Sequence, residues 1–153
     1  MSVSNPKGRI CDSEPGYWYF LAKEALSDAE SAHEKGRRLN ALFSYHMALE
    51  KLLKAICAKK GVLQKVKKTH NLVILAKKCG IYKDLKFEGK KFLLDISNLH
   101  VSASYPSNWK EHNTLNKPGY VKIVSRKTVS MFRVFRGILN DGTMHDTPGE
   151  NRR

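Results

Sequence analysis

The sequence predicts an all-α protein, an up-and-down bundle of about five helices, and three observations support this fold class. Apolar residues recur at the three- and four-residue spacing of an amphipathic helix in five segments, most clearly between residues 39 and 61. Glycine or proline stands at the ends of most of these segments, where helices commonly stop. Sustained strand alternation and internal repeats are both missing, although the run VKIV at 121–124 is β-prone.

The first two helices are expected to pack as an antiparallel hairpin. The first begins near Tyr17, after an irregular lead over residues 1–16, and ends before Gly36. The second follows after only a few residues and ends at Gly61. So short a connection places consecutive helices side by side. The apolar stripe of the second helix consists of Leu42, Tyr45, Leu49, Leu52, Leu53 and Ile56.

Two helices of unequal length are expected next. Thr69 is a candidate N-cap for a short helix that ends at Gly80, with two lysines in its last turn. The fourth helix starts at about Phe87 or Lys90. It must end near Pro106, because the residue before a proline is pushed out of helical geometry.

A polar segment and a fifth helix complete the predicted domain. Residues 107–119 are polar and lie between two prolines, which indicates a loop. The fifth helix runs from Tyr120 to about Asn140, and residues 141–153 are expected to form a loose tail. The helical domain therefore covers residues 17–140, a size that suits a single hydrophobic core.

The charge of the chain is large and unevenly distributed. Twenty-eight Lys and Arg residues against fourteen Asp and Glu residues give a net charge of +14. Residues 54–91 contain twelve basic and two acidic residues, a net charge of +10. Such a field attracts polyanions, so we expect the partner to be a nucleotide or RNA.

Other classes of protein do not fit the composition. The apolar runs are far shorter than the roughly 20 residues that cross a bilayer, and no signal peptide opens the chain, so we expect a cytoplasmic location and no membrane. Cys11, Cys57 and Cys79 are odd in number and lack C-x-x-C spacing. They are predicted to be buried free thiols rather than disulfide partners or zinc ligands.

Three short motifs occur in a fixed order along the chain. Their residues are Ala48, Glu50, Lys51, Lys54 and Ala55, then Thr69, His70 and Leu72, then Tyr105 and Pro106. In order and spacing these resemble the "A-E-K-x-x-K-A", "T-H-x-L" and Tyr-Pro motifs of the HEPN family of nucleotide- and RNA-associated helical domains. The similarity extends over roughly residues 17–139.

This resemblance implies a helical bundle that is commonly a homodimer, with a polar groove at or near the dimer interface. Some HEPN proteins cleave RNA with an Arg followed by four to six residues and then a His. Others bind nucleotides, and some accompany a minimal nucleotidyltransferase in toxin–antitoxin pairs. The resemblance therefore implies a nucleotidyltransferase as a possible partner of this chain.

The chain departs from the catalytic members at two points. Ser104 stands where the family commonly has Arg before Tyr-Pro, and a hydroxyl cannot give phosphate the bidentate charged contact of a guanidinium. The Arg-to-His spacing is also absent. We therefore expect a non-catalytic binding module. Two alternatives remain open: a helical protein-interaction subunit, and a divergent metal-independent ribonuclease that uses His100 or His112 with Arg126 or a lysine. Ser104 is a further candidate catalytic residue.

Candidate binding residues follow the basic charge. The predicted nucleotide- or RNA-binding residues are Lys51, Lys54, Lys59, Lys60, Lys67, Lys68, Ser104 and Tyr105. His46 and Glu50 lie one helical turn apart, but no third residue follows at ligand spacing, which favours a hydrogen-bonding histidine over a metal ligand. P-loop, dinucleotide-binding and zinc-protease motifs are absent, so we expect neither a metal nor a cofactor.

Overall fold

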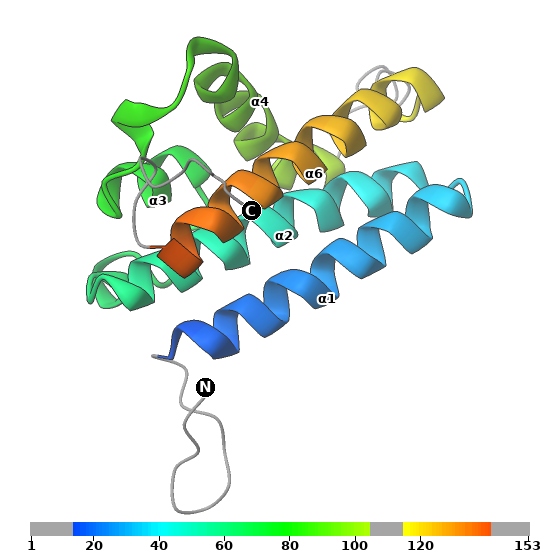
Figure 1. The fold of residues 1–153 in the computed structure, drawn as a ribbon. Coiled ribbons are helices and arrows are strands. Elements are labelled where there is room, and N and C mark those ends of the chain that lie inside the picture. The colour runs from blue at the N-terminus through cyan, green and yellow to red at the C-terminus, as the bar shows by residue number, and fades with distance from the viewer. Residues whose placement is uncertain (1–13, 105–114, 142–153) are drawn as a thin grey trace, which may run out of the picture.

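The fold is described from a computed structural model, which describes residues 14–104 and 115–141, without the side chains of residues 100–104. Within these ranges there are five α-helices and no strand, which confirms the predicted all-α class (Figure 1). The α-helices are α1 (Pro15–Glu34), α2 (Arg38–Lys59), α3 (Leu72–Lys78), α4 (Phe87–Ser104) and α6 (Pro118–Asp141). Short 3₁₀ turns occur at Leu63–Lys65 and Tyr82–Asp84.

Helices α1 and α2 form the predicted antiparallel hairpin. The chain reverses at Gly36, whose φ of 74° lies in the left-handed region that glycine adopts without strain. Trp18, Ala22 and Ala29 of α1 are buried, and α1 packs mainly against α2. The small alanines let the two helix backbones approach closely along this contact.

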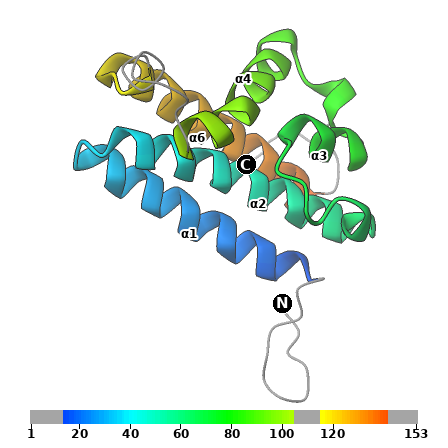
Figure 2. The same cartoon turned by 180° about the vertical axis from the view of Figure 1, so that it is seen from behind.

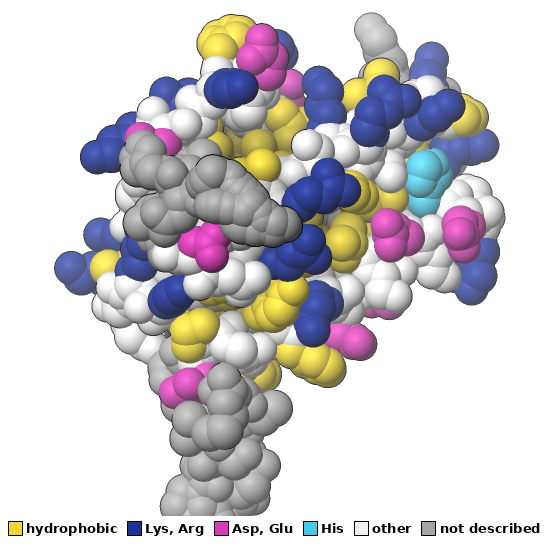
Figure 3. All heavy atoms as spheres, viewed as in Figure 1, with side chains coloured by type: hydrophobic (Ala, Val, Ile, Leu, Met, Phe, Trp, Pro, Cys, Tyr) yellow, Lys and Arg dark blue, Asp and Glu magenta, His cyan; other side chains and the backbone are white. Residues whose placement is uncertain are grey.

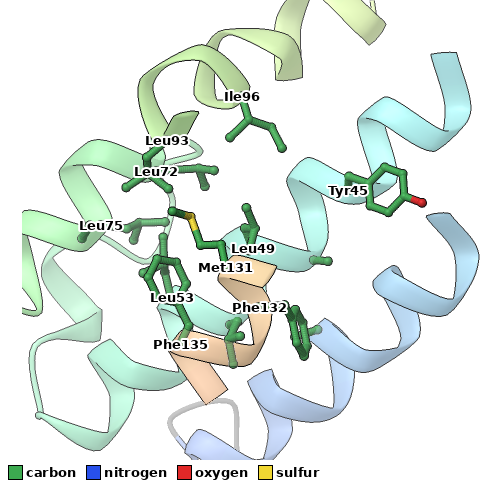
Figure 4. Close-up of a cluster of buried hydrophobic side chains, with 14 of the residues drawn as sticks. Tyr45, Leu49, Leu53, Leu72, Leu75, Leu93, Ile96, Met131, Phe132 and Phe135 are labelled. Carbon is green, nitrogen blue, oxygen red and sulfur yellow. The ribbon is translucent and has the colours of Figure 1, made fainter. Parts of the chain in front are cut away.

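Helix α2 is the centre of the molecule. It contacts α1, α3, α4 and α6, and in Figures 1 and 2 it passes between α1 and the remaining helices. Its neighbours bury it on most sides, so polar residues of α2 are enclosed together with the apolar ones. Figure 4 shows part of the core that surrounds it, with side chains from α2, α3, α4 and α6: Leu49, Leu53, Leu72, Leu75, Leu93, Ile96, Met131, Phe132 and Phe135.

Two helix starts differ from the sequence prediction. Helix α3 is capped by Asn71, whose side-chain oxygen accepts a hydrogen bond from the backbone N–H of Ile74 at 3.1 Å. Thr69 is therefore not the cap; its hydroxyl instead accepts from the N–H of Asn71 at 3.2 Å. Helix α6 begins at Pro118, inside the predicted loop, because proline is well suited to the first turn of a helix. The β-prone run at 121–124 is helical.

Other predictions concern the cysteines and the ends of the chain. Cys57 and Cys79 are buried free thiols, as predicted, whereas Cys11 lies outside the described residues. None of the helices in the described part of the chain combines the length and apolar character needed to cross a membrane. The cytoplasmic location and the domain limits remain predictions.

Candidate functional site

A buried carboxylate lies at the centre of a cluster of basic side chains. The Glu50 side chain is completely buried within α2. Lys54 Nζ donates to Glu50 Oε2 at 2.9 Å, and His70 Nδ1 lies 3.1 Å from both carboxylate oxygens. Because carboxylate oxygens only accept, His70 presents an N–H at Nδ1 in this arrangement. Glu50 thus links Lys54, one turn further along α2, to His70, which precedes α3.

Two more basic side chains adjoin the same carboxylate. His46 Nε2 lies 3.1 Å from the backbone oxygen of His70, and because a carbonyl only accepts, Nε2 is the donor. His46 Nδ1 is 3.7 Å from Glu50 Oε1, and Lys51 Nζ is 3.9 Å from Oε2. A single negative charge is therefore surrounded by two lysines and two histidines, which leaves the cluster with excess positive charge.

The electrostatics of the cluster follow from this enclosure. Burial raises the pKa of Glu50, but the hydrogen bond and charge of Lys54, together with His46 and His70, outweigh it and hold the pKa below its ordinary value. Burial lowers the pKa of Lys51, with Glu50 opposing this shift and Lys54 adding to it. Glu50 is consequently ionised at neutral pH and holds its partners in place.

Local sequence explains how these groups meet. His46, Glu50 and Lys54 follow each other at four-residue spacing, which places them on one side of α2. His70 is delivered by the segment before α3, and this segment is anchored because the N–H of Leu72 donates to the buried hydroxyl of Ser97 at 3.0 Å. The cluster therefore depends on packing between α2, α3 and α4.

The ring of Trp18, on α1, contacts the two lysines of the cluster. The ammonium groups of Lys51 and Lys54 lie 5.3 and 5.5 Å from the ring centroid of Trp18. Cations over an aromatic face are stabilised by the ring quadrupole. Two side chains are accessible from solvent, since the side chain of His70 is 54% exposed and that of Lys51 is 22% exposed. These two form the outer surface of the cluster.

The predicted binding lysines differ in burial and in their hydrogen-bond partners. Lys54 is buried against Glu50, whereas Lys68 is exposed and Lys67 is half-buried in the segment that leads to His70. Lys59 Nζ donates to the backbone oxygen of Leu139, near the end of α6. Lys60 Nζ donates in the same way to Cys79, at the end of α3, at 2.9 Å. Lys59 and Lys60 thus contact the negative ends of two helices.

Of the remaining predicted residues, Arg126 alone has a described side chain. Tyr105 and His112 lie outside the described residues. His100 and Ser104 lie four residues apart on the last turns of α4, where side chains are not described. Arg126 is exposed on α6. The catalytic and binding roles of these five residues remain predictions.

Sequence reasoning missed the partnership between Glu50 and His70. The sequence places Glu50 and His70 in two separate motifs, and no contact between them was predicted. A usable signal was present, since the two family motifs each contribute ionisable residues and follow one another closely. Nothing in the local sequence indicates the contact between Trp18 and the two lysines.

The fold and the cluster together define a class of protein: a small α-helical domain with a buried ionic centre and a basic outer surface. The family model described as the HEPN domain matches residues 16–130, and the chain belongs to this family. Membership supports a nucleotide- or RNA-related module in general terms. No match was found among curated proteins or among solved structures.

Proposed function

We propose that this HEPN domain binds nucleotide or RNA phosphate without cleaving it. The observation that carries the proposal is the buried Glu50 carboxylate, which organises Lys51 and His70. The segment that leads to His70 adds the exposed Lys65 and Lys68 and the half-buried Lys67. Groups held in place before binding lose little conformational freedom when a ligand arrives, which favours affinity. Phosphate is the ligand that such a surface of N–H donors suits best.

The absence of turnover is part of the same proposal. Ser104 replaces the Arg of the catalytic motif, and the required Arg-to-His spacing does not occur in the chain. Phosphoryl chemistry needs positive charge where negative charge develops in the transition state, together with a positioned acid or base. Binding of an intact phosphate group needs only the positive charge.

The test is to incubate the purified protein with labelled RNA and a nucleotide panel at two salt concentrations, following retention and cleavage together. We expect affinity to fall steeply with salt, because lysines that neutralise phosphates release counterions. Lys51→Gln with Lys67→Gln and Lys68→Gln should weaken binding about tenfold or more. The same charge change at exposed positions elsewhere, Lys78→Gln with Lys83→Gln and Lys86→Gln, should have a smaller effect. Salt-independent binding, or cleavage by pure protein, would contradict the proposal.

Homodimerisation through the outer side of α4 belongs to this proposal. Phe87 and Leu94 are 75% and 51% exposed, and their seven-residue spacing places them on one side of the helix. Glu88, Lys91 and Asp95 around them supply both signs of charge. Such a face can pair with its own copy about a two-fold axis, which a surface of one sign cannot do. It also supports a second candidate function, a protein-interaction subunit.

The nucleotidyltransferase partner and the toxin–antitoxin setting rest on the family resemblance alone and remain predictions.

A further inference from the structure

Helix α6 carries a line of positive charge on one side. Lys122, Arg126, Arg133 and Arg136 are all exposed, and no acidic residue occurs in this helix before Asp141. Successive residues of an α-helix are about 100° apart, so these four lie within about 80° of the helix circumference. They extend for about 21 Å along the axis. We call these four residues the α6 basic stripe.

The stripe borders a groove between α6 and α1. Figure 3 shows Lys and Arg side chains next to hydrophobic ones along this boundary. The groove has a volume of about 310 Å³, and Arg133, Arg136 and Lys23 supply cations along it. Its apolar lining comes from Leu26, Val129 and Phe132, and its single carboxylate is that of Glu30. The groove is thus basic at its edges and apolar between them.

Aromatic side chains stand at the α1 edge of this groove. Phe20 is 52% exposed and precedes Lys23 by three residues and Ser27 by seven, so it lies on the side of α1 that lines the groove. Tyr19 is next to it, with the Lys23 ammonium 4.7 Å from its ring centroid. The half-exposed phenyl ring of Phe20 leaves apolar surface in water, and a ligand that covers this surface gains free energy.

The charge of the stripe is not balanced within the described residues. None of its four side chains takes part in an ion pair in the parts of the chain that the structure describes. The salt bridges found there involve α2, α4 and the segment before α3. Like charges along one helix face repel each other and weaken the helix slightly. A bound anion would remove this cost.

This groove lies on a different side of α2 from the Glu50 cluster. Tyr45 of α2 donates to Ser125 Oγ of α6 at 2.8 Å, which identifies the side of α2 that α6 covers. Glu50 follows Tyr45 by five residues and therefore points about 140° away around the helix. The two basic surfaces are separate, and variants of one leave the other intact.

We propose that the α1–α6 groove binds single-stranded nucleic acid, with the α6 basic stripe following the phosphates and Phe20 stacking on a base. Proteins that bind single strands combine a basic groove with aromatic faces, because unpaired bases expose surfaces on which a ring can stack. The proposal rests on the proposed function for its class of ligand, nucleic acid. It adds a second surface and a preference for single strands.

The test measures binding of a labelled single-stranded RNA of about 12 nucleotides by fluorescence anisotropy over a range of salt concentrations. Arg133→Gln with Arg136→Gln should weaken binding about tenfold or more and reduce the salt slope by about 1.4, or about 0.7 for each lost phosphate contact. The control, Lys86→Gln with Lys127→Gln, removes the same charge from exposed sites on the α4 side of the molecule. It should change affinity less than threefold or so.

A second pair of variants tests stacking. Phe20→Ala should weaken binding of the single strand about fivefold or more and leave binding of a duplex of equal length unchanged. Ile74→Ala, at another exposed apolar side chain, should change neither. Equal losses in the groove variant and its charge control would overturn the proposal, as would tighter binding of the duplex. Melting curves check that each variant remains folded.

The two binding proposals fail in different ways. Wild-type affinity in the groove variant, with a loss in the Lys51, Lys67 and Lys68 variant, overturns the groove and leaves the Glu50 surface. The opposite result retains the groove and overturns the Glu50 surface. No binding of any nucleic acid by the wild-type protein overturns both.

Discussion

Glu50 is a fully buried carboxylate, which is uncommon unless its charge is paired and hydrogen-bonded. Lys54 and His70 meet both requirements at 2.9 and 3.1 Å. Taking two charges out of water has a large desolvation cost, and only close geometry with further hydrogen bonds offsets it. The cluster therefore ties α2 to the segment before α3 more specifically than apolar packing does.

The first prediction concerns loss of this carboxylate. Glu50→Gln should lower the free energy of unfolding by about 3–5 kcal/mol, because Lys54 then remains buried without its counter-charge. Urea denaturation measures the change. Asp95→Asn serves as the control, since Asp95 and Lys91 form an ion pair between side chains that are 55% and 64% exposed. That variant should cost about 0.5 kcal/mol or less, and a similar value for Glu50→Gln would contradict a structural role for the cluster.

The second prediction is a pH dependence with a definite sign. The pKa of Glu50 is lower in the folded protein than its ordinary value of 4.5. Its contribution to stability is therefore complete above pH 4.5 and is lost as the pH falls through the lower, folded-state pKa. Unfolding midpoints measured from pH 7 downwards should fall more steeply below pH 4.5 in the wild type than in Glu50→Gln. Parallel curves for the two proteins would show that Glu50 makes no such contribution.

At the scale of the helix, the ends of the elements are stabilised by side chains from elsewhere. Asn71 accepts a hydrogen bond from an N–H at the start of α3. Lys59 of α2 and Lys60 directly after it donate to carbonyls at the ends of α6 and α3. The last carbonyls of a helix lack partners within the helix and carry partial negative charge. Part of the lysine excess thus serves the fold rather than a ligand.

The third prediction compares two glycines in different helix positions. Gly61 follows α2 with a φ of 74°, which is strained for any residue with a Cβ, so Gly61→Ala should destabilise the protein by about 1 kcal/mol. Gly137 lies inside α6, and a Cβ there would meet nothing within 4 Å. Gly137→Ala should stabilise by about 0.5–1 kcal/mol, because alanine loses less conformational entropy in a helix. Thermal unfolding of both variants checks the signs, and equal signs would refute the prediction.

At the scale of the whole molecule, two separate surfaces each gather part of the excess positive charge. One is the Glu50 cluster with the lysines of residues 65–68, and the other is the α6 basic stripe. The outer side of α4 differs from both, because it combines exposed apolar side chains with charges of both signs. We assign anionic ligands to the first two surfaces and a second copy of the chain to the third.

The fourth prediction tests this third surface. Phe87→Glu with Leu94→Glu should convert a dimer into a monomer, because each substitution places a carboxylate where the apolar contact forms. Sedimentation equilibrium measures the molecular mass. Ile74→Glu makes the same change at a side chain of α3 that is 48% exposed and should leave the dimer intact. A monomeric wild-type protein would rule out the α4 dimer.

Much of the fold could be predicted from the sequence, because the spacing of apolar residues within a segment is enough to indicate a helix. The five segments with helical periodicity correspond to α1, α2, α3, α4 and α6, and the predicted hairpin of the first two is present. The predicted helix starts were less accurate. Thr69 and Asn71 are both suitable N-cap residues for α3, and only the structure shows that Asn71 accepts the capping hydrogen bond. Pro118 is the first residue of α6, although the sequence predicts that it lies in a loop.

Sequence alone determined the helical class, the order of the helices, the family and the overall positive charge, since these depend on neighbouring residues and on composition. Tertiary structure alone decided which charges are available to a ligand. Lys54 is buried in an ion pair with Glu50, and Lys59 donates a hydrogen bond near the end of α6. Lys51 and His70 are partly exposed to solvent. The surrounding helices bury the Lys54–Glu50 pair, and contacts between residues 20 or 80 positions apart place His70 and Lys59. No local pattern carries information about this burial or these contacts.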